Sequence, residues 1–389
     1  MKIKKYIPFG KPSLDKREFS KVYNVLKSKW IGTGPEVEDF EKKFSKYKNS
    51  KYSISLNSCT AALHLSLIAL GLKRGDEVIT TPMTFAATIN SIILVGCKPV
   101  LVDIRLDTLN INEKLIEEKI TKKTKAIMIV HFGGIPCDLD KITKIVKKYN
   151  LKLIEDCAHA IETKYKNKHV GNFGDSGCFS FYANKNITTG EGGMLICKKK
   201  NIKEKIKILR LHGMSRDAWK RYLPDSVPKN SPYQHYDIQH VGLKYNMIDI
   251  NAAMGSEQLK KIGKMWKKRK KLSGKYRQSL KNLPLIFQET DEYNYKNAFH
   301  LFTMILNKKK TNKKRDNFLK FLNNAKIGVG VNYRSVTSMT KYKELFSWSK
   351  KTCPIAHYVG ENILSIPLYP YLKESEQKYI IYKVKKFFN

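Results

Sequence analysis

The chain has 389 residues, of which 42% are hydrophobic and 28% are charged, a composition that excludes a disordered polymer. Its 74 basic and 34 acidic residues leave a formal net charge of +40, which favours anionic partners such as phosphorylated metabolites or nucleic acid. No uninterrupted apolar run approaches the roughly 18 residues that a membrane span needs, so the sequence predicts no membrane role.

The positive charge is mostly lysine and is spread along the whole chain. Lysine runs such as Lys198 to Lys200 and Lys308 to Lys310 are short and fall where helix surfaces or turns are expected. Proteins that bind nucleic acid usually gather their charge into an arm, a recognition helix or a stripe. We therefore favour a lysine-rich surface suited to anionic substrates over nucleic-acid binding, which a steep salt dependence of binding would reveal.

The cysteines are scattered singly, without a C-x-x-C pair. They are Cys59, Cys97, Cys137, Cys157, Cys178, Cys197 and Cys353. This spacing favours neither a zinc ribbon nor a disulfide framework, and we expect no metal site. Free thiols are typical of a reducing cytosol, so we expect a cytoplasmic protein.

From about residue 51 to residue 193, short β-branched runs alternate with amphipathic stretches, which is typical of an α/β layer structure with a largely parallel sheet. The predicted strands cover residues 52–56, 77–81, 99–102, 126–131, 151–155 and 178–182. The predicted helices between them cover residues 60–72, 85–95 and 139–149. Each helix is compatible with a crossover connection between parallel strands.

The second half of the chain begins with a long predicted helix over residues 249–280, which would bridge to another domain. Beyond it, the patterns predict strands over 299–306 and 328–333 and helices over 315–325 and 374–388. We expect a large domain over residues 1–255, including an N-terminal segment 1–35, and a small C-terminal α+β domain over residues 256–389.

The first segment with chemical content runs from Leu56 to Ala62 and reads Leu-Asn-Ser-Cys-Thr-Ala-Ala. A predicted strand ends here in small polar residues and a helix begins. The free backbone N–H groups and hydroxyls at a helix start favour a phosphate, as does the helix dipole. An ordinary Ser or Thr N-cap gives the same pattern, so this segment alone does not identify an anion site.

The second segment, from Leu153 to Ala160, is an apolar strand that ends in Glu155 and Asp156. The carboxyl ends of strands line the ligand crevice of an open α/β sheet, so a buried Asp156 needs a cationic partner there. A protonated heterocyclic nitrogen would serve. A structural Asp that caps the following helix explains the segment equally well.

The third segment, from Phe179 to Gly193, places Lys185 between an apolar strand and a glycine-rich turn. Partial burial lowers the pKa of a lysine and makes it a Schiff-base nucleophile. Leu195 breaks a G-x-G-x-x-G pattern and no P-loop is present, so dinucleotide and nucleoside-triphosphate sites are not predicted. A phosphate cradle, a buried carboxylate and a Schiff-base lysine together are what pyridoxal 5'-phosphate requires.

These segments resemble the DegT/DnrJ/EryC1/StrS family of sugar aminotransferases, within the aspartate-aminotransferase fold type of pyridoxal-phosphate enzymes. The resemblance runs nearly end to end, and the block from Phe179 to Gly193 is its most specific part. The other matching segments are residues 30–35 with 40–41, 57–64, 81–85, 124–127 with 130–131, 155–156, 209–213, 354–356 and 364–368. The resemblance implies a three-layer α/β/α large domain with a mostly parallel sheet, and a small C-terminal domain.

The resemblance also implies roles for individual residues. Lys185 would form the Schiff base and then move the proton between substrate and cofactor, and Asp156 would pair with the pyridine nitrogen. Phe85 would stack on the ring, although a plain core aromatic is the alternative, and His159 would lie near the phenolic oxygen. The residues that would hold the phosphate are Cys59, through its backbone, Thr60 and Ser180.

Two segments depart from the family pattern. Many members supply an Asn from the neighbouring subunit to the phosphate, and this chain has Lys244 at that position, a point charge suited to an anion. We therefore expect a homodimer with shared active sites. Asn332 and Thr337 stand where relatives often carry histidines, in a loop that would approach the sugar, so the substrate stays the open question.

We interpret the chain as an aminotransferase that passes an amino group from L-glutamate to a nucleotide-linked keto sugar, of the NDP-4-keto-6-deoxyhexose type. The alternatives are another ketone acceptor, namely a 3-keto sugar, a cyclitol ketone or a small phosphorylated ketone. A different class of alternative is a non-catalytic regulator that keeps the fold, which the loss of Lys185 or Asp156 would have favoured. Both residues are present.

Overall fold

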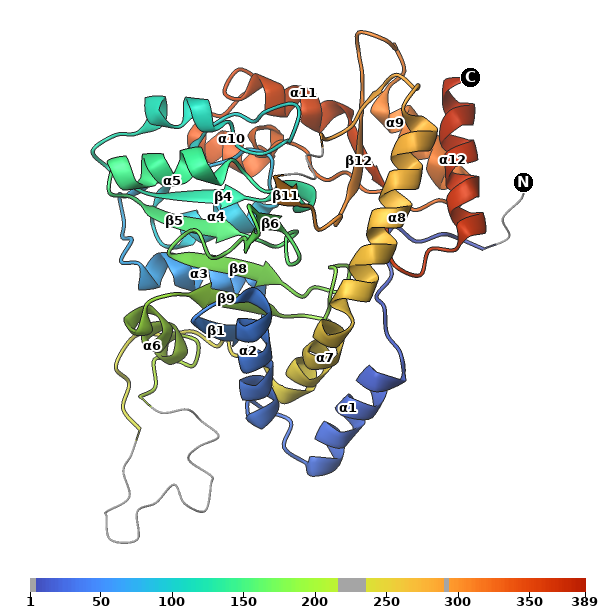
Figure 1. Ribbon diagram of the computed structural model, residues 1–389. Coiled ribbons are helices and arrows are strands. Elements are labelled where there is room, and N and C mark those ends of the chain that lie inside the picture. The colour runs from blue at the N-terminus through green and yellow to red at the C-terminus, as the bar shows by residue number, and fades with distance from the viewer. Residues whose placement is uncertain (1–4, 216–235, 290–293) are drawn as a thin grey trace, which may run out of the picture.

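The computed structural model describes residues 5–215, 236–289 and 294–389. Its central feature, within those ranges, is a seven-stranded sheet in the order β1-β9-β8-β5-β4-β2-β3 (Figure 1). The strands are β1 (Tyr52–Leu56), β2 (Glu77–Thr80), β3 (Lys98–Leu101), β4 (Thr124–Val130), β5 (Lys152–Asp156), β8 (Ser176–Ser180) and β9 (Gly193–Cys197). Neighbours from β3 to β8 are parallel, whereas β9, which the sequence patterns did not predict, runs antiparallel to both β8 and β1.

Helices cover both faces of this sheet. One face packs against α3 (Cys59–Ala69), α4 (Ala86–Leu94) and α6 (Lys200–Leu209). The other packs against α2 (Pro35–Lys48), α5 (Leu139–Lys148) and α7 (Asp249–Lys260). Because both faces are covered, β4 is apolar over five consecutive residues, and all of Ala126 to Val130 are buried. The predicted α/β class, with its three layers and mostly parallel sheet, is confirmed.

The long helix predicted over residues 249–280 is two helices, α7 and α8 (Ile262–Leu280). The chain leaves the helical conformation at Lys261, with φ −104° and ψ 3°. The Lys261 ammonium is buried and pairs with Glu18 of α1 (Lys16–Ser28), at 2.5 Å, and with Asp15, at 3.1 Å. These long-range ion pairs accompany the break, and α8 then runs as a column toward the C-terminal elements (Figure 1).

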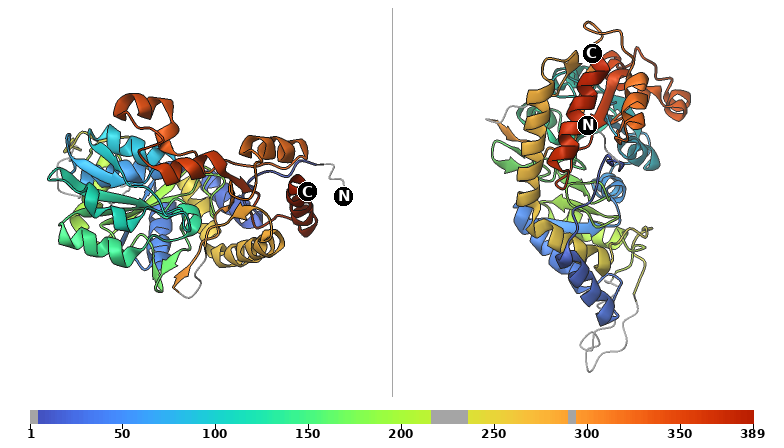
Figure 2. Two further views of the ribbon diagram at one scale, coloured as in Figure 1. Left: turned by 90° about the horizontal axis from the view of Figure 1, so that it is seen from above. Right: turned by 90° about the vertical axis from the view of Figure 1, so that its right-hand side faces the viewer.

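The C-terminal part contains a second, antiparallel sheet of β10 (Leu285–Ile286), β12 (Phe302–Leu306) and β13 (Ile363–Ile366). The helices of this part are α9 (Arg315–Asn324), α10 (Thr340–Phe346), α11 (Pro354–Asn362) and α12 (Glu374–Phe388). Figure 2 shows α9 and α12, in orange and red, gathered beside α8 at one end of the molecule. The expected domain boundary between residues 255 and 256 falls inside α7, and the division into two domains stays a proposal.

The strand predicted over residues 328–333 is wrong. Only Gly330 pairs there, through an isolated bridge to Ser365. The following residues, Asn332 and Tyr333, turn away from the small sheet and line a cavity at the large one. The third sheet is also small and joins β6 (Lys164–Tyr165), β7 (Lys168–His169) and β11 (Tyr295–Lys296). Across the described ranges, no helix is both long and apolar enough to cross a membrane.

Candidate active site

A cavity of about 480 Å³ opens at the edge of the large sheet where the parallel strands β5 and β8 end. This is the edge at which ligands bind in open α/β sheets, because the strand ends and the following turns leave a crevice there. The cavity brings together seven residues that the sequence singled out, namely Cys59, Thr60, Phe85, Asp156, His159, Ser180 and Lys185. Lys244, the eighth, is exposed and does not line this cavity within one chain.

Lys185 lies in the turn between β8 and β9. Its backbone N–H donates to the Tyr182 carbonyl at 2.9 Å, which holds the turn, and its side chain lines the cavity. Burial lowers the pKa of the ammonium to about 8. At pH 7 about one molecule in ten therefore carries the neutral amine, the form that attacks a carbonyl.

Asp156, at the end of β5, also lines the cavity. The residue is 5% exposed, and its carboxylate accepts hydrogen bonds from Thr88 Oγ1, at 2.9 Å, and from the Ala158 N–H, at 3.0 Å. Burial nevertheless raises the pKa of Asp156. A buried carboxylate with a raised pKa and an open face calls for a cationic partner in the cavity.

The start of α3 forms the third wall. Ser58 is the N-cap and accepts the Ala61 N–H at 3.1 Å, while the amides of Cys59 and Thr60, in the first turn, have no acceptor within the helix. Burial raises the pKa of the Cys59 thiol well above its usual value, so an anion would meet its backbone rather than a thiolate. A Cβ on Gly193 would lie 2.4 Å from the Ser58 carbonyl, so only glycine lets β9 pass so close to the helix start.

His159 and Tyr333 form a hydrogen-bonded pair inside the cavity. The Gly133 N–H donates to His159 Nδ1 at 3.3 Å, so Nε2 carries the proton and donates to the Tyr333 hydroxyl at 3.0 Å. Burial keeps the pKa of His159 well below its usual value, which leaves the ring neutral. Phe85 faces Tyr333 with ring centroids 6.0 Å apart and is 62% exposed, so it is not a core aromatic.

Behind Lys185, the side chain of Asn186 is held in one orientation. Its Nδ2 donates to Glu162 Oε2 at 2.8 Å and to the Ala298 carbonyl at 2.9 Å, and its Oδ1 accepts from His300 Nδ1 at 3.0 Å. Burial raises the pKa of Glu162 to about 7. Sequence reasoning assigned no role to Glu162, His300 or Tyr333, because each meets the site through contacts between distant segments that no local pattern marks.

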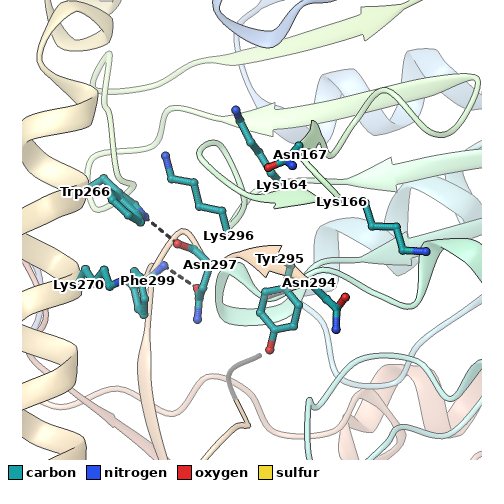
Figure 3. Close-up of a pocket in the computed structure, with 10 residues that line it drawn as sticks. All are labelled: Lys164, Lys166, Asn167, Trp266, Lys270, Asn294, Tyr295, Lys296, Asn297 and Phe299. Atoms are coloured by element: carbon teal, nitrogen blue, oxygen red, sulfur yellow. Dashed lines mark hydrogen bonds between the residues drawn. The ribbon is translucent and has the colours of Figure 1, made fainter. Parts of the chain in front are cut away.

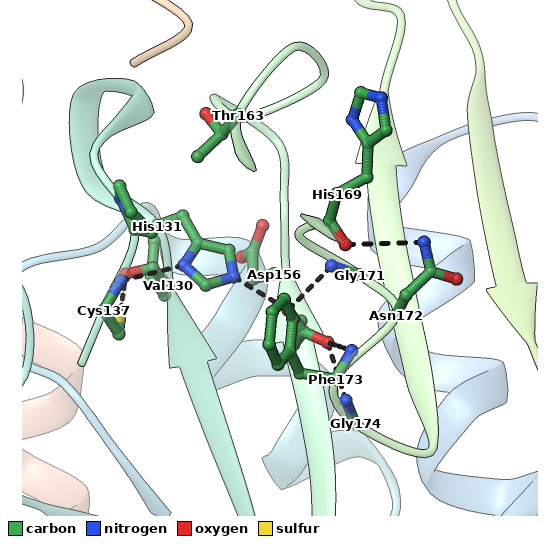
Figure 4. Close-up of polar contacts among 12 residues, drawn as sticks. Val130, His131, Cys137, Asp156, Thr163, His169, Gly171, Asn172, Phe173 and Gly174 are labelled. Carbon is green, nitrogen blue, oxygen red and sulfur yellow. Dashed lines mark hydrogen bonds and ion pairs between the residues drawn. The ribbon is translucent and has the colours of Figure 1, made fainter. Parts of the chain in front are cut away.

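Glu155, next to Asp156, is a structural carboxylate. Its Oε1 accepts the amides of Phe173 and Gly174, at 2.8 and 2.7 Å. Its Oε2 accepts Gly171 N–H, at 2.7 Å, and His131 Nε2, at 3.0 Å. Figure 4 shows these donors, which belong to His131, Gly171, Phe173 and Gly174, lying close together. Burial opposes ionisation of Glu155, but the donors outweigh it and lower its pKa. Because successive strand residues face opposite sides, Asp156 alone reaches the cavity.

A sequence model of the DegT/DnrJ/EryC1/StrS aminotransferase family matches residues 12–385. The spore coat polysaccharide biosynthesis protein SpsC of Bacillus subtilis is 37% identical over 381 residues, which is 98% of this chain and 96% of SpsC. Spr1654 of Streptococcus pneumoniae, assigned as a sugar aminotransferase, matches with a TM-score of 0.90 in its PMP-form, at 31% identity and 98% coverage of each chain. Its PLP-form matches with a TM-score of 0.89.

A second solved structure extends the likeness. PseC of Helicobacter pylori is an aminotransferase involved in the biosynthesis of pseudoaminic acid. It matches this chain with a TM-score of 0.88 at 28% identity, over 99% of each chain. The similarity therefore spans nearly the whole chain, including the segments that line the cavity.

Proposed function

Because the chain belongs to the DegT/DnrJ/EryC1/StrS aminotransferase family, we propose that it moves an amino group from L-glutamate to a nucleotide-linked keto sugar. The acceptor we favour is of the NDP-4-keto-6-deoxyhexose type, used in making cell-surface glycans or amino sugars. Enzymes of this family depend on pyridoxal 5'-phosphate. The names of SpsC and PseC support a sugar acceptor, since both refer to the biosynthesis of a polysaccharide or a sugar acid.

One observation carries the proposal. Lys185, with a pKa of about 8, and Asp156, with a raised pKa, line a single cavity together with the first amides of α3. A nucleophilic amine, a carboxylate in need of a cation and a set of free amide donors match the aldehyde, ring nitrogen and phosphate of the cofactor. The cofactor supplies an electron sink for the carbanion when bound.

We assign the roles as follows. Lys185 holds the cofactor and then moves a proton at its Nζ, as general base and acid. Asp156 pairs with the protonated ring nitrogen, and Thr88 and Ala158 fix the orientation of its carboxylate. Phe85 offers an exposed ring face for stacking, and His159 contributes a neutral imidazole beside the cofactor oxygen.

We assign binding of the cofactor phosphate to the start of α3. The backbone of Cys59 and the hydroxyls of Thr60 and Ser180 line the cavity at that wall. We place Lys244 at the same phosphate from a second copy of the chain, in a homodimer. We also place the enzyme in the cytoplasm, in keeping with its seven free and buried cysteines.

The donor half of the reaction provides the decisive test. Adding L-glutamate to the purified enzyme, without any acceptor, should bleach the visible absorption band of the bound cofactor within one turnover. Recovery of the band can then be screened with nucleotide keto sugars. A band that glutamate leaves unchanged contradicts the donor assignment, and a protein that acquires no band after incubation with pyridoxal phosphate contradicts the catalytic proposal.

Shared sites make a separate prediction. Lys185→Ala and Lys244→Ala chains, each inactive or nearly so, should regain activity when mixed under conditions of subunit exchange. Random exchange makes half of the dimers mixed and each mixed dimer has one intact site of two, so we expect about a quarter of wild-type activity.

The matched control for this mixing experiment is Lys185→Ala with Asp156→Asn. Both residues line the cavity of one chain, so every site of a mixed dimer carries a defect and no activity should return. Equal results for the two mixtures would rule out the shared site.

A further inference from the structure

A second pocket lies between α8 and the small sheet of β6 and β11, apart from the cavity around Lys185. Its volume is about 200 Å³, and it shares no lining residue with that cavity. Figure 3 shows Lys164 and Lys166 of the β6 hairpin and Lys296 of β11 around it, with Trp266 and Lys270 of α8 facing them. Four lysines thus line one pocket, of which Lys166 points away from the others toward Asp140.

Two of these lysines oppose each other. Lys164 of β6 and Lys296 of β11 are direct cross-strand partners, and both side chains are half-buried. Like charges directly opposite each other destabilise an antiparallel pair. The pairing of Lys164 with Lys296 is therefore unfavourable for the stability of this short sheet. Pairs that lower stability in this way are found most often at functional sites.

Among the described residues that line the pocket, none is acidic. Lys166 pairs with Asp140, and the carboxylate of the buried Glu162 is bound to Asn186. Burial lowers the pKa of Lys296, Glu162 partly opposes this and Lys164 adds to it. The ammonium of Lys296 lies 4.1 Å from the Trp266 ring centroid, which holds it toward the pocket.

The positive field continues behind the ladder. His169 is the cross-strand partner of Lys164 on its other side. Its pKa is far below the usual value because of burial, with Lys48, Lys164 and Lys296 adding to the effect. The ammonium of Lys48 is itself buried, 3.0 Å from the Ile161 carbonyl. An anion in the pocket would therefore meet Lys164 and Lys296 directly, whereas Lys48, behind the ladder, lies near Glu155 and Glu162.

We propose that this pocket is an anion site for a phosphate or diphosphate group, which bridges Lys164 and Lys296. Lysine is a common phosphate ligand because its compact charge meets the oxygens from any direction. The pocket volume of about 200 Å³ is ample for a phosphate or a diphosphate group. The proposal is independent of the reaction at Lys185.

The test uses the holoenzyme, so that the bound cofactor already occupies the start of α3. Sodium phosphate and sodium diphosphate are titrated by calorimetry at an ionic strength fixed with sodium chloride, which holds general screening constant. The Lys164→Gln and Lys296→Gln variants should bind diphosphate at least about tenfold more weakly. The matched control is Lys309→Gln with Lys310→Gln, two exposed lysines outside the pocket, which should bind as wild type does.

A second measurement needs no variant. Diphosphate should protect Lys164 and Lys296 of the wild-type holoenzyme from acylation, followed by mass spectrometry, while Lys309 stays equally reactive. Without the anion, Lys164→Gln should also unfold at the same or a higher temperature, because it relieves the repulsion. Equal affinities in wild type and the pocket variants, or equal acylation with and without diphosphate, would overturn the proposal.

Discussion

Replacing Lys185 by alanine should lower turnover by about 10⁴-fold or more, because one change removes both the covalent link and the general base. The fold should persist. The backbone bond from residue 185 to the Tyr182 carbonyl survives the substitution, and the lost ammonium is one that burial disfavours. Steady-state turnover and thermal unfolding are the two measurements. A fully active Lys185→Ala enzyme would contradict the mechanism.

The same residue controls how the apoenzyme takes up its cofactor. Only the neutral amine attacks the aldehyde, so the rate of visible band formation should rise with pH and level off above about 8, the pKa of Lys185. An ordinary exposed lysine would level off more than two units higher. Lys185→Arg, which keeps the charge but not the nucleophile, should form no such band at any pH.

Replacing Asp156 by asparagine should lower kcat by about 10²–10³-fold, the scale on which a preorganised charge at a reacting centre acts. An amide cannot keep the cofactor nitrogen protonated, so the electron sink weakens. The free energy of unfolding should change little or increase, because burial disfavours the native carboxylate. The amide oxygen can still accept the Ala158 N–H and its nitrogen can donate to Thr88. Steady-state kinetics measures the change in kcat, and chemical denaturation measures the change in the free energy of unfolding.

Glu155→Gln is the matched control, one residue earlier on β5. Both oxygens of Glu155 accept backbone amides, so an amide nitrogen at either place points a donor at a donor. An unsatisfied buried donor costs about 1–3 kcal/mol, and we expect a loss of stability rather than of chemistry. If Asp156→Asn instead lost stability and kept its rate, Asp156 would be a structural carboxylate like its neighbour.

Local hydrophobic patterns were sufficient to predict helices and strands whose side-chain pattern repeats every few residues. Alternating apolar runs placed six strands of the large sheet, since strands buried on both faces must be apolar throughout. They missed β9, whose residues Gly193 to Cys197 follow a glycine-rich turn and add an antiparallel strand to a parallel sheet. They also joined α7 to α8, which the structure separates at Lys261, where the side chain pairs with Glu18, far away in the chain.

The sequence by itself determined the α/β class, the family resemblance and the residues at strand and helix ends that meet around the cavity, including Lys185 and Asp156. Those residues lie in short contiguous segments, and the order of residues within each segment is enough to indicate its chemical role. Only the tertiary structure decided that Tyr333 enters the cavity and that Lys164 opposes Lys296. The physical reason is that these contacts join segments distant in the chain, and packing of whole elements, not local periodicity, brings them together.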